Sequence, residues 1–565
     1  MQMQTLIFCI KFAITKLVNH EIKYAIEYHE ETKHSEISIQ LSRHYLDWDN
    51  RPRPFKIYTK LPSMALPQDF CKPSLDAITS ISRIKSIESA PASILDIKKV
   101  AEILFFSAGI TREMKYSYGT YYMRAASATG ALYPIELYIV CQDIPPGLEA
   151  GVYHFCPGDF SLTKLRAGDY RTELAAAAGE NKDIMTSPVT VIFTSIAWRN
   201  AWKYQARSYR HWFWDSGVIA ANLLATSVSN SLQSSLIMGF VDDIVNCMLL
   251  LDDKREAAIA MAAIGIGLSK GQIELKAKEI ISSSLPSPEV LPLSKKSEVE
   301  YPEIWKIHRA SYLSDKEKVK HWVGCGTQLK KQGMFKAKTL YSKSLEYEEP
   351  EVAVSSYSKP SLGDVILLRG SSRRFDRSPI SFDQLSTILH ASTRGAPLDF
   401  LGQDADRITI DVYMIINDVE GLDRGGYFFN RYANSLEELK RNVSRDMSGY
   451  LCLGQTLFSD ASVVFFLMTD LVTILHTCGN RGYRAVQFEA GIIAGKIYLS
   501  AYAQQLGASG STFFDDAVTE FFSPHAKDKS TMIAVGVGIP GYKSRPGKIL
   551  TARLSRSQLL KKEAF

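Results

Sequence analysis

At 565 residues the chain is too long for one hydrophobic core of ordinary size, so we expect two to four domains. Hydrophobic residues make up 46% and charged residues 22%, as in folded globular proteins, and the net charge of +6 includes no long basic run that would favour a nucleic-acid partner. No apolar stretch reaches the roughly 20 residues needed to cross a bilayer. The eight cysteines are scattered without a Cys-x-x-Cys pair, which argues against a disulfide framework or a zinc site. We therefore expect a cytoplasmic protein with no membrane partner and no metal.

Two stretches of the chain carry the same series of predicted elements. Each begins with an amphipathic helix, continues with strand-like runs and a hairpin-like piece, and then has a strand, a long helix, another helix and a final strand. In the first stretch these include a helix at 94–109 and strands at 135–143 and 189–196; in the second, a helix at 381–392 and strands at 408–418 and 461–470.

Local sequence also repeats at a nearly constant distance. "GVYHF" at 151–155 returns as "GGYFF" at 425–429, and "RSYRHWFWDSG" at 207–217 returns as "RGYRAVQFEAG" at 481–491. Tyr153 and Tyr427 differ by 274 positions, as do Gly217 and Gly491. "FVDDIV" at 240–245 returns as "FFDDAV" at 513–518, where the paired acids read as helix caps and packing residues rather than metal ligands. Four pairs of matching segments, in the same order in both stretches, indicate two copies of one domain.

The repeat sets the predicted domain boundaries. We expect an N-terminal leader region (1–74), a first domain (75–275), a Ser-, Pro- and Lys-rich linker (276–354), a second domain (355–550) and a C-terminal tail (551–565). Strands with helices segregated around them imply an α+β fold. Two such units in one chain most simply pack as a pseudo-symmetric dimer, and further oligomerisation stays open.

A dense set of hydrogen-bond donors opens the second domain. "RGSSRRF" at 369–375 alternates Arg369, Ser371 and Arg373, which can supply charge-assisted donors to a phosphate. The alternative is a solvated helix start with surface arginines.

Several motifs together resemble the nitroreductase-like flavoprotein superfamily and, within it, the SagB-type dehydrogenase branch. These are "RGSSRRF", the "RAASATGALYP" element at 124–134, the leader "YHEETKHSEISIQLSRHYLDWDNRPRPFKIY" at 28–58 and the closing "GIPGYKSRPGK" at 538–548. The resemblance implies two nitroreductase-like domains and an FMN cofactor in their interface. The cofactor-binding residues that it implies are Arg369, Ser371, Arg373, Ser127, Thr129, Gly130, Glu489, Ala490, Gly491, Lys543 and Arg545. For Glu489, the alternative is an ordinary helix-start carboxylate.

The two copies have diverged in opposite ways. Ile84, Ser86 and Glu88 align with the phosphate-binding triplet of the second copy, so the first copy has lost both arginines and placed a carboxylate there. The second copy instead lacks the Ser-x-x-Gly-Ala-Leu-Tyr-Pro element, having "STRGAPLDFLGQDADR" at 392–407. We therefore expect one composite FMN site in each chain.

The predicted catalytic residues are Lys203 and Tyr204. By resemblance, "WKYQARSYR" at 202–210 matches the Lys-Tyr element that SagB-type dehydrogenases use in proton transfer, and the equivalent positions in the second copy are Thr477 and Cys478. A ring dehydrogenation needs a base as well as a hydride acceptor, and desolvation can tune a lysine or tyrosine for that role.

Three functions remain open from the sequence. The first is an FMN-dependent oxidoreductase that transfers a hydride to flavin N5, with azoline-to-azole oxidation on a peptide as the reaction that the resemblance implies. The second is an NAD(P)H-dependent nitro or quinone reductase acting on a small molecule. The third is a flavin- or peptide-binding scaffold without catalysis.

Overall fold

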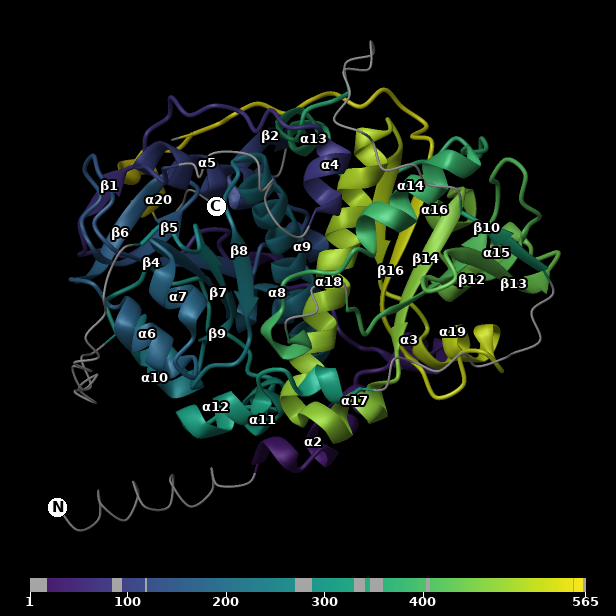
Figure 1. The fold of residues 1–565 in the computed structure, drawn as a ribbon, viewed down its shortest axis with the longest axis horizontal. Helices are drawn as coiled ribbons and strands as arrows, with labels where there is room; N and C mark the ends of the chain where they lie inside the picture. The colour runs from purple at the N-terminus through teal and green to yellow at the C-terminus, as the bar shows by residue number, and fades with distance from the viewer. Residues whose placement is uncertain are drawn as a thin grey trace.

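The two matching stretches fold into two seven-stranded antiparallel sheets that lie side by side (Figure 1). The computed structural model describes residues 18–83, 94–116, 119–269, 287–329, 341–345, 359–402, 407–551 and 553–561. The strand order is β1-β6-β5-β4-β7-β9-β8 in the first sheet and β10-β13-β12-β11-β14-β16-β15 in the second, so each strand has a counterpart. The chain is therefore an α+β protein with two large sheets of one topology.

The central strands occupy the apolar runs that the sequence predicts, whereas one edge strand of each sheet lies in the predicted leader (63–65) or in the predicted linker (341–344). The first sheet contains β1 (Ser63–Ala65), β4 (Ile135–Cys141), β5 (Gly151–Cys156), β6 (Ser161–Ala167), β7 (Val189–Ile196), β8 (Ser234–Ile237) and β9 (Glu256–Ile264). The second contains β10 (Tyr341–Ser344), β11 (Asp411–Ile416), β12 (Gly425–Asn430), β13 (Ser435–Arg441), β14 (Val463–Thr469), β15 (Gly507–Ser511) and β16 (Ser530–Gly538). A separate hairpin, β2 (Ile110–Tyr116) and β3 (Gly119–Arg124), belongs to the first half.

Irregularities in the sheets repeat as well as the strands. The β5–β6 ladder shifts register between Val152 and Tyr153, and the β12–β13 ladder shifts between Gly426 and Tyr427, 274 positions later. The β7–β9 and β14–β16 ladders shift at another pair of positions with the same separation. Because a bulge bends its strand and increases the local twist, both sheets are bent at the same places.

The two long helices α9 (Ser208–Ser229) and α18 (Asn480–Ala503) pack against each other between the sheets (Figure 1). Their contact lies at two equivalent glycines. A Cβ atom on Gly217 would lie 2.6 Å from the carbonyl oxygen of Phe488, and one on Gly491 would lie 2.7 Å from that of Trp214. Any larger residue would separate the helices here, and one hydrophobic cluster contains side chains of both halves.

The first helix of each unit starts at a capping residue that the sequence supplies. Before α5 (Ile97–Ala108), the Asp96 side chain accepts from the Lys99 amide; before α14 (Phe382–Ser392), Ser381 and Gln384 form a capping box. The other helices are α2 (Lys23–Glu31), α3 (Glu36–Leu41), α4 (Ala77–Ser82), α6 (Arg171–Ala177), α7 (Lys182–Thr186), α8 (Ala197–Tyr204), α10 (Asp242–Met248), α11 (Pro302–Ala310), α12 (Lys316–Trp322), α13 (Leu362–Leu368), α15 (Arg445–Leu451), α16 (Thr456–Asp460), α17 (Leu471–Cys478), α19 (Asp515–Phe522) and α20 (Arg556–Leu560). Among the described residues, no helix is both long enough and apolar enough to cross a bilayer.

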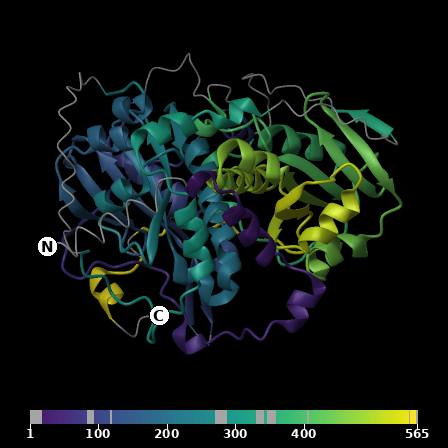
Figure 2. The same cartoon turned by 90° about the horizontal axis from the view of Figure 1, so that it is seen from below.

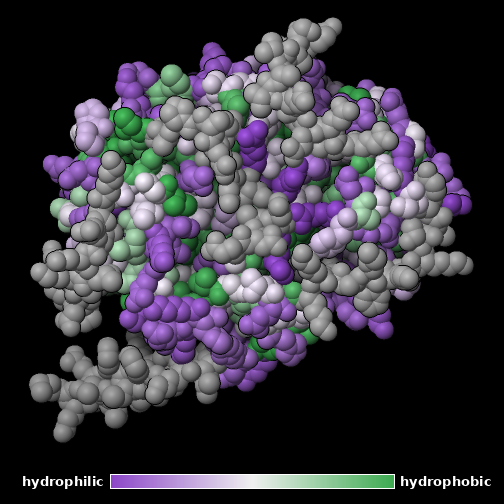
Figure 3. Space-filling view, viewed as in Figure 1, coloured by the Kyte–Doolittle hydropathy of each residue, from purple (hydrophilic) through white to green (hydrophobic). Residues whose placement is uncertain are grey.

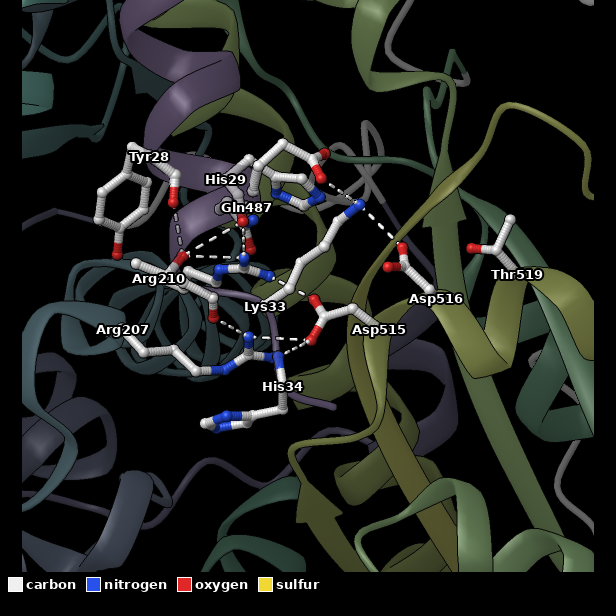
Figure 4. Close-up of polar contacts among 12 residues, drawn as sticks. Tyr28, His29, Lys33, His34, Arg207, Arg210, Gln487, Asp515, Asp516 and Thr519 are labelled. Carbon is white, nitrogen blue, oxygen red and sulfur yellow. Dashed lines mark hydrogen bonds and ion pairs between the residues drawn. The ribbon is translucent and has the colours of Figure 1, made fainter. Parts of the chain in front are cut away.

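The leader helix α2 joins the two halves through a buried ion-pair cluster (Figure 4). Asp515, the first residue of α19, accepts from Arg207 at 3.0 Å and from Arg210 at 2.8 Å. The same two guanidinium groups donate to carbonyl oxygens at the end of α2, those of Thr32 and His29. In Figure 2 the leader, coloured purple, runs across the lower face of both halves.

An equivalent cluster forms around α11, which lies inside the predicted linker. Asp242 accepts from Arg481 at 2.6 Å and from Arg484 at 2.8 Å, and these arginines donate to the carbonyl oxygens of Ser311 and His308. Both units therefore carry a leader helix that bonds an arginine pair of its own half and an aspartate of the other. Residues 302–322 are accordingly a structural element rather than a connecting loop. The repeated Asp-Asp motifs supply the two buried aspartates.

Two cysteines far apart in the sequence lie within bonding distance. Cys325 and Cys478 form a disulfide across a sequence separation of 153 residues. We expected no disulfide framework from the cysteine spacing, and that spacing gave no sign of this single pair. The bond connects the segment after α12 to the end of α17.

Candidate active site

The predicted phosphate-binding segment begins where α13 ends. Arg369 is the C-cap residue of α13, and its guanidinium is buried with 4% exposure. Its Nε and Nη2 atoms donate to the carbonyl oxygens of Ala125 (2.9 Å) and Arg124 (2.8 Å) in the first half. Ser371 is half-buried and Arg373 is exposed. Arg369 thus holds the two halves together at the point where the segment turns toward solvent.

The closing segment of the chain lies beside this one. The Gly541 amide donates to the carbonyl oxygen of Arg374 at 3.0 Å, and the Asp376 amide donates to that of Ile539 at 2.9 Å. These bonds bring the strap that carries Lys543 and Arg545 next to residues 369–376. Within the described ranges, no carboxylate lies in ion-pair distance of Arg369, Arg373, Lys543 or Arg545. A group of cations without a protein counter-charge is the expected environment for a phosphate.

An arginine of the first half fixes both segments. Arg112, on β2, donates to the carbonyl oxygens of Leu367, Leu368 and Arg369 at 2.8, 2.8 and 2.6 Å, and to that of Arg545 at 3.1 Å. It therefore caps the last carbonyls of α13, where a positive charge also complements the helix dipole. No repeated motif marks Arg112, because the β2–β3 hairpin has no counterpart among the described residues of the second half.

A cavity of the first half lies behind this basic group. Its lining includes Arg124, Ser127, Ala128, Tyr133 and Asp215. The predicted residues Thr129 and Gly130 follow directly, in the 3-10 turn η3 (Thr129–Ala131). Both the Thr129 amide and hydroxyl donate to Asp215 Oδ1, at 2.9 and 2.7 Å.

The predicted Lys-Tyr pair lies beside this 3-10 turn. Gly130 has φ of 63°, and a Cβ atom there would lie 2.6 Å from the Tyr204 hydroxyl, so only glycine allows this contact. Burial lowers the pKa of Lys203, and the charge of Arg373 lowers it further. Burial also raises the pKa of Tyr204, with the Asp215 charge adding to that effect and the Arg373 charge opposing it. The arginine of one half and the Lys-Tyr pair of the other therefore face one site, called the open site below.

The remaining predicted residues lie in the contact between the long helices. Glu489 is buried on α18 and accepts from the Thr409 amide at 2.9 Å and from the Thr409 hydroxyl. Ala490 is buried beside it, and Gly491 contacts α9. These contacts connect the three residues to the fold rather than to the basic group, so their role toward a cofactor stays a prediction.

The equivalent position on the other side of the molecule is filled by the chain itself, and we call it the closed site. Asp399, at the start of the 3-10 turn η6 (Asp399–Leu401), accepts from the amides of Met238 (3.0 Å) and Gly239 (2.8 Å). Trp322 donates from its indole to the carbonyl oxygen of Cys478 at 2.8 Å and lies 3.2 Å from where a Gly239 Cβ would be. Cys478, the counterpart of Tyr204, is cross-linked to Cys325.

Helix α12 covers the closed site with one face and meets solvent with the other. Val319 and Trp322 are buried, whereas Lys316, Glu317 and Lys320 are exposed. In Figure 3, hydrophilic residues predominate at the lower left of the view, where α12 lies in Figure 1. The segment 84–93, with Ile84, Ser86 and Glu88, lies outside the described residues.

The sequence analysis missed Asp215 although a signal existed. Asp215 and Glu489 occupy equivalent places in the repeated "WDSG" and "FEAG" stretches. Both are buried, and each accepts from the amide and hydroxyl of one threonine. Burial raises the pKa of each carboxyl to about 7. An acid repeated at a position of constant offset could have been recognised as a buried anchor.

Comparison with known proteins gives a family for part of the chain. Residues 366–539 match the nitroreductase family. The Methanocaldococcus jannaschii protein MJ1384, provisionally named a nitroreductase, is 25% identical over 169 residues, which are 30% of this chain and 81% of that protein. The trifolitoxin-processing protein TfxB of Rhizobium leguminosarum bv. trifolii is 29% identical over 171 residues, which are 29% of this chain and 46% of TfxB.

A solved structure matches almost the whole chain. It is a protein of Anabaena variabilis, also provisionally named a nitroreductase, with a TM-score of 0.69 and 25% identity. The match covers 92% of this chain and 99% of that one. The chain therefore has a nitroreductase-like fold, and its sequence matches the nitroreductase family over residues 366–539.

Proposed function

We propose that the chain is an FMN-dependent oxidoreductase with one composite site, built by its two halves as a pseudo-dimer. The observation that carries this proposal is the open site, where cations of one half without a counter-charge face the Lys203–Tyr204 pair of the other. When bound, FMN would supply a two-electron acceptor that the side chains lack.

The open site fits the phosphate and the ring of FMN. Arg373, Lys543 and Arg545 would hold the phosphate with Ser371, while the buried Arg369 keeps the segment in place. Thr512, the counterpart of Gly239, has a buried hydroxyl oxygen with no hydrogen-bond partner among the described residues. In the closed site the neighbouring amides bind Asp399, and in the open site a ligand group could take the equivalent place.

Lys203 and Tyr204 would handle the protons of the reaction. Lys203 is half-buried, and its lowered pKa increases the fraction of neutral amine that can act as a base. Tyr204 keeps its proton at neutral pH because burial raises its pKa. The pair can therefore accept one proton and donate another on the same side of the site.

The substrate that we favour is an azoline in a peptide, oxidised to an azole. The SagB-like motifs support this reaction, and the name of TfxB, a trifolitoxin-processing protein, describes work on a peptide product. A second candidate is the NAD(P)H-dependent reduction of a nitro or quinone compound, which the provisional names of MJ1384 and the Anabaena protein favour.

The test is the flavin content of the purified protein. We expect about one FMN in each chain, and we expect Arg373→Ala combined with Lys543→Ala to weaken FMN binding by about 100-fold, since each charge-assisted contact contributes roughly 1.5 kcal/mol or more. Ser86→Ala and Glu88→Ala, at the equivalent place of the first half, should leave binding unchanged. No flavin after reconstitution, or equal loss in both sets of variants, would contradict the composite site. Turnover of a synthetic thiazoline peptide and of NADH then separates the two candidate reactions.

A further inference from the structure

One acid of the open site, Asp215, is not among the residues proposed to hold FMN. Asp215 lies on α9 with 3% exposure, and it faces the cavity behind the basic group. Its Oδ1 atom accepts both donors of Thr129, and its Oδ2 atom lies 3.5 Å from the Asn200 amide nitrogen. No cation forms an ion pair with it among the residues that the structure describes. A buried carboxylate without a counter-charge is costly, which suggests that it is kept for a purpose.

The equivalent acid of the second half makes a comparable contact away from the Lys-Tyr pair. Glu489 accepts from the amide and hydroxyl of Thr409, two residues before the start of β11. That contact anchors a loop to a helix, and the Thr409 carbonyl oxygen also accepts from the Thr469 hydroxyl at the end of β14. Asp215 binds Thr129, whose neighbour Gly130 touches the Tyr204 hydroxyl. Only the first-half contact therefore leads to a predicted catalytic group.

We propose that Asp215 is a positioning residue, which holds the Thr129–Gly130 turn against the Tyr204 hydroxyl so that this hydroxyl keeps one orientation in the open site. The inference rests on the proposed role of Tyr204. The Tyr204 ring is held on its other side by His211, at 4.6 Å between ring centroids and 86° between planes. The turn and the histidine together leave the tyrosine little freedom.

The surroundings of Asp215 make its charge sensitive to pH. The titratable and charged groups near it are Tyr204 from α8, and Tyr133 and Arg124, which line the same cavity. Arg124 is engaged elsewhere, donating to the carbonyl oxygen of Pro54 and lying 4.6 Å from the Tyr133 ring centroid. Burial then raises the pKa of Asp215 to about 7. Protonation would replace one acceptor site by a donor and weaken the hold on Thr129.

The first test needs no substrate. In the full chain, hydrogen exchange of the Thr129 amide should become at least 10-fold faster in Asp215→Ala, and Asp215→Asn should restore most of the protection. Glu489→Ala should act in the same way on Thr409 but not on Thr129. The NMR signal of ring-labelled Tyr204, assigned with Tyr204→Phe, should shift in Asp215→Ala and not in Glu489→Ala. An unchanged Tyr204 signal in Asp215→Ala would overturn the proposal.

The second test uses turnover of a synthetic thiazoline peptide by the FMN-loaded protein. Asp215→Ala should lower kcat about 10-fold with KM and FMN content near those of the wild type, and the kcat–pH profile should lose its dependence near pH 7. In the Tyr204→Phe background the same change should have no further effect. A kcat decrease equal to that of Asp399→Ala, a buried acid of the closed site, would contradict positioning. A wild type without FMN would contradict the proposed function, while the exchange and NMR results would still report on Asp215.

Discussion

The open and closed sites share a plan and differ in one segment. Each lies between a long helix and a 3-10 turn, and each is flanked by a leader helix that holds an arginine pair. After α2 the first leader lies along the surface, with Tyr45 and Trp48 exposed. After α11 the second leader turns inward and places Trp322 and Cys325 in the site. A duplicated site can thus be blocked when a few residues follow a different path, while the surrounding fold stays the same.

The largest expected effect is the removal of either buried aspartate. Asp515→Ala and Asp242→Ala should each lower the free energy of unfolding by about 3–5 kcal/mol, because each leaves two buried arginines without a counter-charge. Urea unfolding measures this. Asp516→Ala is the control, since the Asp516 side chain is 81% exposed and its ion pair with Lys33 should contribute less than about 1 kcal/mol. Unequal losses at the two aspartates would show that the clusters are not equivalent.

The disulfide distinguishes the closed site from the open one. Cys325→Ser should lower the free energy of unfolding by about 2–4 kcal/mol, because the bond closes a long loop. FMN content should stay at about one per chain, since the first half lacks both arginines at the aligned positions Ile84 and Glu88. The exposed Cys71 provides the control variant Cys71→Ser. A rise toward two FMN per chain would mean that closure alone keeps the second site empty.

Two glycines with similar positive φ angles, one in each site, allow the two sites to be tested separately. Gly130 and Gly402 have φ of 63° and 74°, and an added Cβ would lie 2.6 Å from the Tyr204 hydroxyl or from a methyl carbon of Thr327. Replacing either by alanine should cost roughly 1–2 kcal/mol. Only Gly130→Ala should also lower turnover of the thiazoline peptide, by about 10-fold. Equal turnover in both variants would show that Tyr204 takes no part in the reaction.

The smallest effect concerns the pH dependence of stability. Burial raises the pKa of Asp215 to about 7, so the folded protein loses stability as the pH rises from about 4, where the unfolded carboxyl ionises, to about 7. Asp215→Asn removes this loss, so between pH 4 and pH 8 the variant should gain at least about 1 kcal/mol of stability relative to the wild type. Thermal unfolding at the two pH values measures it. A gain of equal size at both would show that Asp215 is ionised throughout.

The sequence predicts the parts of this molecule that depend on local pattern and repetition. The strands at 135–143 and 189–196 and their counterparts follow from apolar runs, and the repeat gives the two-sheet topology. The repeated acids are predicted as helix caps and packing residues: Asp242 and Asp515 are indeed buried, but they pair with arginines, and the N-cap residues are Val241 and Phe514.

Other parts depend on contacts that no local pattern records. The α2 and α11 leaders have little sequence in common, so their equivalence becomes visible only in their bonds to the arginine pairs. The filling of the closed site rests on contacts of Trp322 with residues distant in the sequence. Arg112 lies on a hairpin that occurs once in the described part of the chain, so the repeat does not reveal it.

The cluster around α2 also affects how the two halves pair while the chain is being synthesised. His34 and Asp515, which share a hydrogen bond of 2.8 Å, are separated by 481 residues. At a synthesis rate of about 5–20 residues per second, the leader waits about 25 to 100 s for this partner to leave the ribosome. During that time the first half presents an apolar helix face built to receive a domain of its own kind. Neighbouring ribosomes on one message would bring two such halves together, so slow translation should favour mispaired chains.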